Sequence, residues 1–168
     1  MKDMMVRELK SRLLTEMRII AESNLSGAGW KYDAKDDYIS IVLQKHYSLS
    51  ICIEWSHWSW YKRGAGIWIN PSEIIPDKFI GKVNANADLK GFLTANGFHE
   101  SRENAWYPFM KTIPAEVFFS NDSCRLVEEC LFRAIQDAKG LADNLWEKVF
   151  KPFVENKNVI SMLVEALQ

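Results

Sequence analysis

Apolar residues spaced three and four apart predict a helix near the N-terminus. Charged residues fill the positions between them, as expected for a helix that buries one face. The sequence SGAG at 26–29 ends the pattern, so we predict this helix for residues 3–24. Its apolar stripe consists of Val6, Leu9, Leu13, Met17 and Ile20.

Alternation of apolar and polar residues predicts three strands in the centre of the chain, near 37–44, 46–55 and 60–70. The links between them are short, so neighbouring strands are expected to be antiparallel. Alternation also divides the second strand into two faces. One face is expected to carry Tyr47, Leu49, Ile51, Ile53 and Trp55, and the other Ser48, Ser50, Cys52 and Glu54.

Beyond these strands, the two prolines of INPSEIIPDKF at 69–79 are expected to break the sheet. Residues 86–95 form a predicted short helix, with Asn86 as its N-cap and the Asn-Gly pair at 96–97 at its end. A fourth strand is predicted for 105–113. Because Pro108 has no N–H to donate, this strand is expected at a sheet edge or at a bulge.

A long helical region is predicted for the C-terminal part of the chain, starting after Ser-Asn-Asp at 120–122. Gly140 is expected to bend it, and Pro152 to end or kink it near Phe150. A last helix is predicted for 158–167. The order of elements predicts a single α+β domain, residues 1–168, with an antiparallel sheet of about four strands. An N-terminal helix and a long C-terminal helical region are expected to pack on this sheet.

Length and charge narrow the class of protein. A chain of 168 residues fits one domain, and a net charge of −1 gives no global field that would attract nucleic acid or an acidic membrane. No apolar run approaches the ~20 residues of a membrane helix, and the charged N-terminus lacks an apolar signal region. We therefore expect a cytoplasmic protein without membrane association, in which Cys52, Cys124 and Cys130 are reduced thiols.

Tryptophan is unusually frequent, and four of the seven copies lie in IEWSHWSWYKRGAGIWIN at 53–70. If residues 60–69 form one strand, Trp60 and Trp68 share a face with Gly64 and Gly66 between them. Indoles beside small residues would suit the docking of a partner, because Trp and Tyr are enriched in binding hot spots. The alternative is internal packing, in which a helix of the same chain covers the glycines.

We predict a partner-binding site in this stretch. The candidate residues are His57, Trp58, Trp60, Tyr61, Lys62, Arg63 and Trp68. A second interpretation uses Lys62 and Arg63, with the tryptophans, to bind single-stranded nucleic acid. Acidic residues interleaved with the nearby lysines at 31 and 35 count against it.

Catalytic and metal-binding patterns are scarce. The three histidines are isolated, the cysteine spacing does not match zinc pairs, and no GxSxG or phosphate-binding loop is present. Asp36 and Asp37, which open a strand near Glu54, could hold a divalent ion, although a charged turn is the more ordinary interpretation. No catalytic residue, metal site or cofactor is therefore predicted.

Several segments together resemble a known arrangement: YISIVL, then SLSICIEWSHWSWYKRGAGIWI, LKGFLTANGF, ENAWYPFMK and SNDSCRLVEECLFRAIQDAKGL. They resemble the region after the catalytic core in some bacterial PD-(D/E)XK nuclease superfamily proteins, over residues 38 to about 145. The family's Asp/Glu-x-Lys motif is absent, since Trp55 and Ser56 follow Glu54. The resemblance implies an accessory region standing alone. We therefore expect a non-enzymatic protein-binding domain, serving as an inhibitor, immunity factor or adaptor in a bacterial or phage conflict or nuclease system. The alternative is a nucleic-acid-binding accessory domain of such a system.

Overall fold

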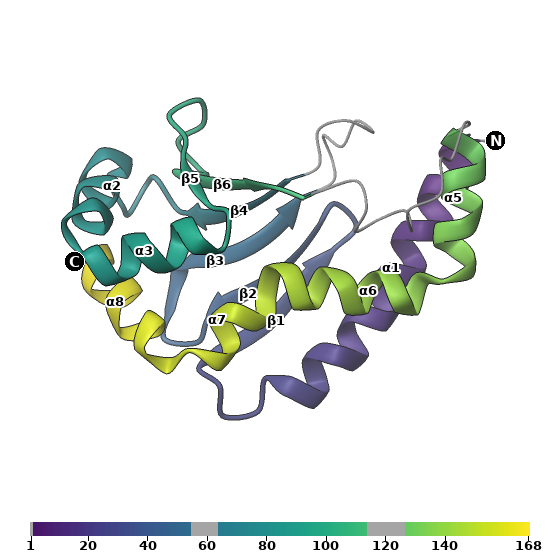
Figure 1. Cartoon of the computed structure of the whole chain (residues 1–168), viewed down its shortest axis with the longest axis horizontal. Coiled ribbons are helices and arrows are strands. Elements are labelled where there is room, and N and C mark those ends of the chain that lie inside the picture. The colour runs from purple at the N-terminus through teal and green to yellow at the C-terminus, as the bar shows by residue number, and fades with distance from the viewer. Residues whose placement is uncertain (1, 55–63, 114–126) are drawn as a thin grey trace.

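The computed structural model describes residues 2–54, 64–113 and 127–168. Its centre is a six-stranded antiparallel sheet in the order β1-β2-β3-β4-β6-β5 (Figure 1). The strands are β1 (Trp30–Lys35), β2 (Tyr38–Leu43), β3 (His46–Glu54), β4 (Gly64–Ile69), β5 (His99–Glu100) and β6 (Phe109–Thr112).

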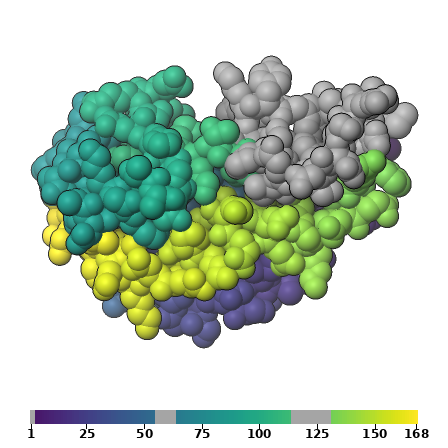
Figure 2. Space-filling model, in the orientation of Figure 1, coloured from purple at the N-terminus to yellow at the C-terminus, as the bar shows by residue number. Residues whose placement is uncertain are grey.

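Helices precede, interrupt and follow the strands. They are α1 (Lys2–Asn24), α2 (Pro76–Ala85), α3 (Ala87–Ala95), α5 (Val127–Gln136), α6 (Ala138–Leu145), the π-helical turn η1 (Trp146–Phe150), α7 (Lys151–Glu155) and α8 (Lys157–Leu167). Helices α5 and α6 pack on α1, whereas α8 packs on α2 and α3. Helices α6 and α7 cross in front of β1 and β2 (Figure 1). Figure 2 shows them as a band between the N-terminal residues (purple) and the segment with α2 and α3 (teal). The fold is therefore α+β.

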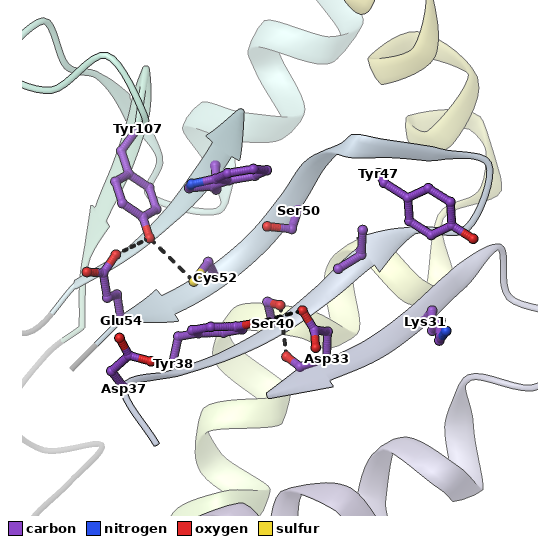
Figure 3. A pocket seen from close by; sticks show the side chains of 12 residues that line it. Lys31, Asp33, Asp37, Tyr38, Ser40, Tyr47, Ser50, Cys52, Glu54 and Tyr107 are labelled. Atoms are coloured by element: carbon purple, nitrogen blue, oxygen red, sulfur yellow. Dashed lines mark hydrogen bonds between the residues drawn. The ribbon is translucent and has the colours of Figure 1, made fainter. Parts of the chain in front are cut away.

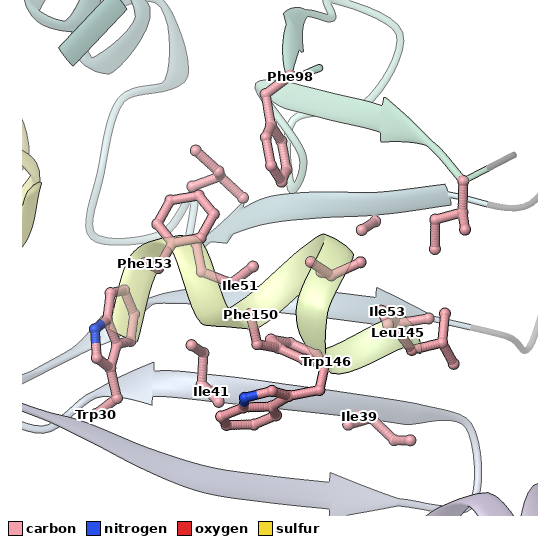
Figure 4. Close-up of a cluster of buried hydrophobic side chains, with 14 of the residues drawn as sticks. Trp30, Ile39, Ile41, Ile51, Ile53, Phe98, Leu145, Trp146, Phe150 and Phe153 are labelled. Atoms are coloured by element: carbon pink, nitrogen blue, oxygen red, sulfur yellow. The ribbon is translucent and has the colours of Figure 1, made fainter. Parts of the chain in front are cut away.

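The core lies between these helices and one face of the sheet, which we call the core face (Figure 4). Its fully buried strand residues include Ile39, Ile41, Leu49, Ile51, Ile53, Ile67 and Ile69. The helices contribute aromatic rings: Phe153 contacts Trp30 edge-to-face at a centroid distance of 6.1 Å, and Trp146 lies beside Phe150 at 5.6 Å. Burial of this much apolar surface is the main stabilising term of the fold.

Much of the predicted element pattern is confirmed. The first helix and the strands at 38–43 and 46–54 match, and Asn86 caps α3 by accepting a hydrogen bond from the N–H of Leu89 at 3.1 Å. Gly97 ends that helix with a φ of +82°, a conformation that glycine adopts without strain.

The predicted sheet of about four strands is too small, because β1 and β5 were not predicted. β1 begins directly after the glycine turn at 26–29, and β5 has only two residues, too few to show alternation. The prolines of 69–79 do interrupt the run of strands after β4, and the chain returns to the same sheet with β5 and β6. Pro76 also starts α2, where its missing N–H costs nothing. β6 covers only Phe109–Thr112 of the predicted 105–113, and it lies inside the sheet, between β4 and β5.

Tyr47 is a correction to the predicted faces. Alternation places it with Leu49 on the core face, yet its side chain is 68% exposed and lies on the opposite face. The register between β2 and β3 shifts between Val42 and Leu43, so Val42 pairs with Ser50 while Leu43 pairs with His46. Such an irregularity interrupts the alternation, and here it turns Tyr47 outward.

The C-terminal helical region bends at Asp137 rather than at Gly140. The Asp137 carboxylate accepts a hydrogen bond from the N–H of Gly140 at 3.1 Å and so caps α6. Further along, Pro152 has no N–H for the carbonyl of Lys148 four residues earlier. The Nζ of Lys111 donates to that carbonyl at 2.6 Å, which ties β6 to the π-helical turn just before the proline.

Candidate binding site on the open face of the sheet

The face of the sheet opposite the core face, which we call the open face, carries small and polar residues at its centre. Ser40, Cys52 and Gly66 pair across β2, β3 and β4, and Ser50 pairs with Trp68 one step further along. This pairing confirms that Ser50, Cys52 and Gly66 share a face with Trp68, whereas Trp60, expected at the other end of the floor, lies outside the described residues. Because the central side chains are small, the larger side chains at the margins determine the shape of the open face.

A hollow of about 500 Å³, which we call the Asp33 hollow, lies over β1, β2 and β3 (Figure 3). Lys31 and Tyr47 lie at one end of it, and Asp37 and Glu54 at the other. No residue of a described helix lines it. Its lining is Lys31, Asp33, Asp37, Tyr38, Ser40, Val42, Tyr47, Ser50, Cys52, Glu54, Trp68 and Tyr107.

A second hollow of about 490 Å³, the Trp106 hollow, adjoins the first and shares Cys52, Glu54, Trp68 and Tyr107 with it. The ring of Trp106 stacks on Trp68 at a centroid distance of 5.6 Å and an angle of 21°. The backbone holds this stack in place, since the carbonyl of Trp106 accepts from the N–H of Ile69 at 2.9 Å. Trp106 is nevertheless 44% exposed and offers a large apolar surface.

Tyr107 stands between the two hollows and organises the acidic end of the first. Its hydroxyl donates to the Glu54 carboxylate at 2.5 Å and also lies 3.4 Å from the Cys52 sulfur (Figure 3). The ring sits over Gly66, where an added Cβ would lie 2.4 Å from Cδ1. Gly66 is therefore required for the position of the tyrosine, whose hydroxyl in turn contacts the carboxylate.

Tyr38 plays a similar part on β2, because its hydroxyl donates to the Asp33 carboxylate at 3.0 Å. Burial and this hydrogen bond raise the pKa of Tyr38 to about 12. Burial and the neighbouring Cys52 and Glu54 raise the pKa of Tyr107. Both phenols stay protonated at neutral pH and act as donors that hold carboxylates in place.

The chemistry of Cys52 favours binding over nucleophilic catalysis. Burial raises the pKa of its thiol to about 12, so the nucleophilic thiolate is disfavoured. This agrees with the interpretation of Cys52 as a small buried thiol. Asp37 and Glu54, considered as metal ligands, do line one hollow. Among residues 2–54, 64–113 and 127–168, however, no group of three or more His, Cys, Asp or Glu side chains could hold a metal ion.

Of the predicted site residues, the structure describes only Trp68, which lies on the open face as expected. The other six, His57, Trp58, Trp60, Tyr61, Lys62 and Arg63, lie outside the described residues. Sequence reasoning missed Trp106, Tyr107, Asp33 and Tyr38. Asp33 and Tyr38 could have been found by extending the alternation to β1 and β2, whereas Trp106 and Tyr107 lie in a turn without periodicity.

Comparisons of the chain with models of protein families, with curated proteins and with solved structures find no match. Among the helices of the described segments, none combines the length and the apolar character needed to cross a bilayer. The open face is thus the feature on which a functional proposal has to rest.

Proposed function

We propose that this chain is a non-enzymatic protein-binding domain whose open face docks on a partner protein. The observation that carries the proposal is the pair of hollows that no described helix lines, formed by strand and turn residues and flanked by the stacked Trp68 and Trp106. Partly exposed aromatic rings over a low polar floor are the composition typical of a binding hot spot. Large aromatic rings that remain exposed on the surface favour a role in binding another protein.

The biological setting of the proposal comes from the sequence. The resemblance to the accessory region of PD-(D/E)XK nuclease proteins, without the family's acid-x-lysine motif, supports an inhibitor, an immunity factor or an adaptor. Such a protein acts sterically, by covering a surface of its partner. The raised pKa of the Cys52 thiol supports the same non-enzymatic interpretation.

Nucleic acid is the less favoured partner. Among the described residues that line the Asp33 hollow, Asp33, Asp37 and Glu54 are carboxylates and one, Lys31, is a cation. Carboxylates repel phosphate groups. The basic residues that would favour nucleic acid, Lys62 and Arg63, lie outside the described residues.

Affinity capture from cells of the source organism tests the proposal. We expect the wild-type chain to retain a specific protein, and Trp106→Ala and Tyr47→Ala each to weaken its binding at least tenfold when the purified pair is measured. Phe132→Ala is the matched control, because Phe132 is a 57% exposed ring on α5, away from the open face. Equal loss in Phe132→Ala, or no loss in the two open-face variants, would remove the open face as the docking surface.

A purified chain that cuts DNA in the presence of Mg²⁺ would contradict the non-enzymatic assignment. The Glu54→Ala variant would then show whether the carboxylate beside Tyr107 takes part.

A further inference from the structure

The Asp33 hollow has more specific chemistry than the rest of the open face. Asp33 and Asp37 contribute two carboxylates, and neither forms an ion pair with a described residue. Tyr38 fixes the first of them by its hydrogen bond at 3.0 Å. Two acidic side chains, one of them fixed in place, make this part of the hollow suited to a cation.

Ser50 gives an independent indication of a ligand. Its side chain lies on the floor of the hollow, the residue is only 6% exposed, and its hydroxyl has no hydrogen-bond partner among the described residues. Its oxygen is not among the fully enclosed atoms that lack a partner, so the small exposed part of the residue includes the hydroxyl. A hydroxyl that opens to the hollow and is not used within the described protein is suited to accept a hydrogen bond from a bound N–H group.

The walls of the hollow are aromatic. The rings of Tyr38 and Tyr107 lie near Asp37 and Glu54, and that of Tyr47 closes the far end beside Lys31 (Figure 3). A guanidinium group fits such surroundings better than an ammonium group. Its planar array of donors matches carboxylates, and its flat face stacks on aromatic rings.

We propose that the Asp33 hollow binds an arginine side chain of the partner protein. Asp33 and Asp37 pair with the guanidinium group, and the Ser50 hydroxyl accepts a hydrogen bond from one of its N–H groups. This inference rests on the proposed function and names the partner's chemistry. The stacked indoles of the adjoining Trp106 hollow then receive a neighbouring apolar side chain of the same segment. Glu54 shapes the site from the side, where Tyr107 already donates to it.

The test uses two small probes that differ only in charge. N-acetyl-arginine amide and N-acetyl-citrulline amide have nearly the same shape, but citrulline is neutral. Each is titrated into the full chain and followed by NMR. We expect saturable shifts at the backbone amides of β1, β2 and β3 with arginine, in the millimolar range usual for a single side chain, and at least tenfold weaker binding of citrulline. N-acetyl-lysine amide is the third probe and should bind more weakly than arginine.

Variants locate the binding. Asp37→Asn should weaken arginine binding about tenfold, and Ser50→Ala about threefold, as expected for one charged and one neutral hydrogen bond. The Asp37 side chain forms no hydrogen bond with a described residue, so its substitution should leave the spectrum otherwise unchanged. Asp143→Asn, an exposed carboxylate on α6, is the matched control and should change nothing.

Equal binding of arginine and citrulline, shifts away from the three strands, or unchanged affinity in Asp37→Asn would each overturn the inference. Lysine binding as tightly as arginine would overturn the choice of guanidinium. Because these titrations need no partner, their failure is distinct from a failure of partner capture by the Trp106→Ala comparison.

Discussion

Replacing Gly66 by alanine tests whether the site depends on close packing of Tyr107 against β4. The added Cβ would lie 2.4 Å from Cδ1 of the ring and 3.3 Å from the carbonyl oxygen of Phe109. Carbon atoms in contact prefer a separation of about 3.5–4.0 Å, so the ring has to withdraw by about 1 Å or more. Gly66→Ala therefore overpacks a position where no side chain fits.

The magnitude follows from two effects. Overpacking of a well-packed position costs about 1–3 kcal/mol. Withdrawal of the ring also breaks the hydrogen bond from the Tyr107 hydroxyl to Glu54, worth about 1.5–3 kcal/mol because the acceptor is charged. Together the two effects should lower the free energy of unfolding by about 2.5–6 kcal/mol. With an m-value of about 2 kcal/mol/M, the midpoint of urea unfolding would fall by about 1–3 M.

The assay is urea unfolding followed by circular dichroism, with two comparisons. Gly81→Ala is the matched control, since nothing lies within 4 Å of its added Cβ on α2, and it should stabilise the helix by up to about 1 kcal/mol. A Tyr107→Ala background removes the two nearest atoms and leaves the Phe109 carbonyl oxygen, at 3.3 Å, as the next contact, so Gly66→Ala should there cost less than about 1 kcal/mol. An equal cost in both backgrounds would refute the packing explanation.

Three further predictions concern other contacts. Asp137→Ala removes the cap on the N–H of Gly140 and should lower the free energy of unfolding by about 1 kcal/mol, measured by urea unfolding. Lys111→Met leaves the carbonyl of Lys148 without its donor and should cost about 1–2 kcal/mol in the same assay. Burial raises the pKa of Cys52 from 9.0 to about 12, so the folded state holds this proton more tightly than the unfolded state does. The stability should therefore decline as the pH rises from about 9 to about 12, and Cys52→Ala should decline less steeply.

Matched substitutions control for general effects. Asp143→Ala on the exposed side of α6 and Lys90→Met on the exposed side of α3 should each change stability by less than about 0.5 kcal/mol. Costs equal to those of Asp137→Ala and Lys111→Met would contradict the assigned hydrogen bonds. For Cys52, parallel pH profiles of the variant and the wild type would contradict the raised pKa.

Local pattern was sufficient for the elements whose signals are local. The stripe of α1, the alternation of β2 and β3, and the cap at Asn86 all depend on residues within a few positions of one another. The same alternation identified the open face at Ser50, Cys52, Gly66 and Trp68, because the side-chain period of a strand is two wherever pairing is regular.

Alternation failed where tertiary pairing overrides it. Tyr47 lies on the open face rather than the core face because the β2–β3 register shifts next to it. No residue type at that position predicts the shift. β5 is held by its pairing with β6 rather than by any pattern of its own. The bend at Asp137 arises from a cap that competes with helix continuation, which propensity alone does not reveal.

By itself, the sequence determined the class of fold, the buried face of the sheet and the composition of the opposite face, since each of these follows from periodicity. Only the tertiary structure decided the site. Asp33 on β1, Glu54 on β3 and Tyr107 after β5 are far apart in the chain and line one hollow because the strand order β1-β2-β3-β4-β6 brings them together. Strand order and close approach, such as the ring of Tyr107 over Gly66, depend on contacts between segments that are distant in the sequence. A local pattern of residues therefore cannot predict them.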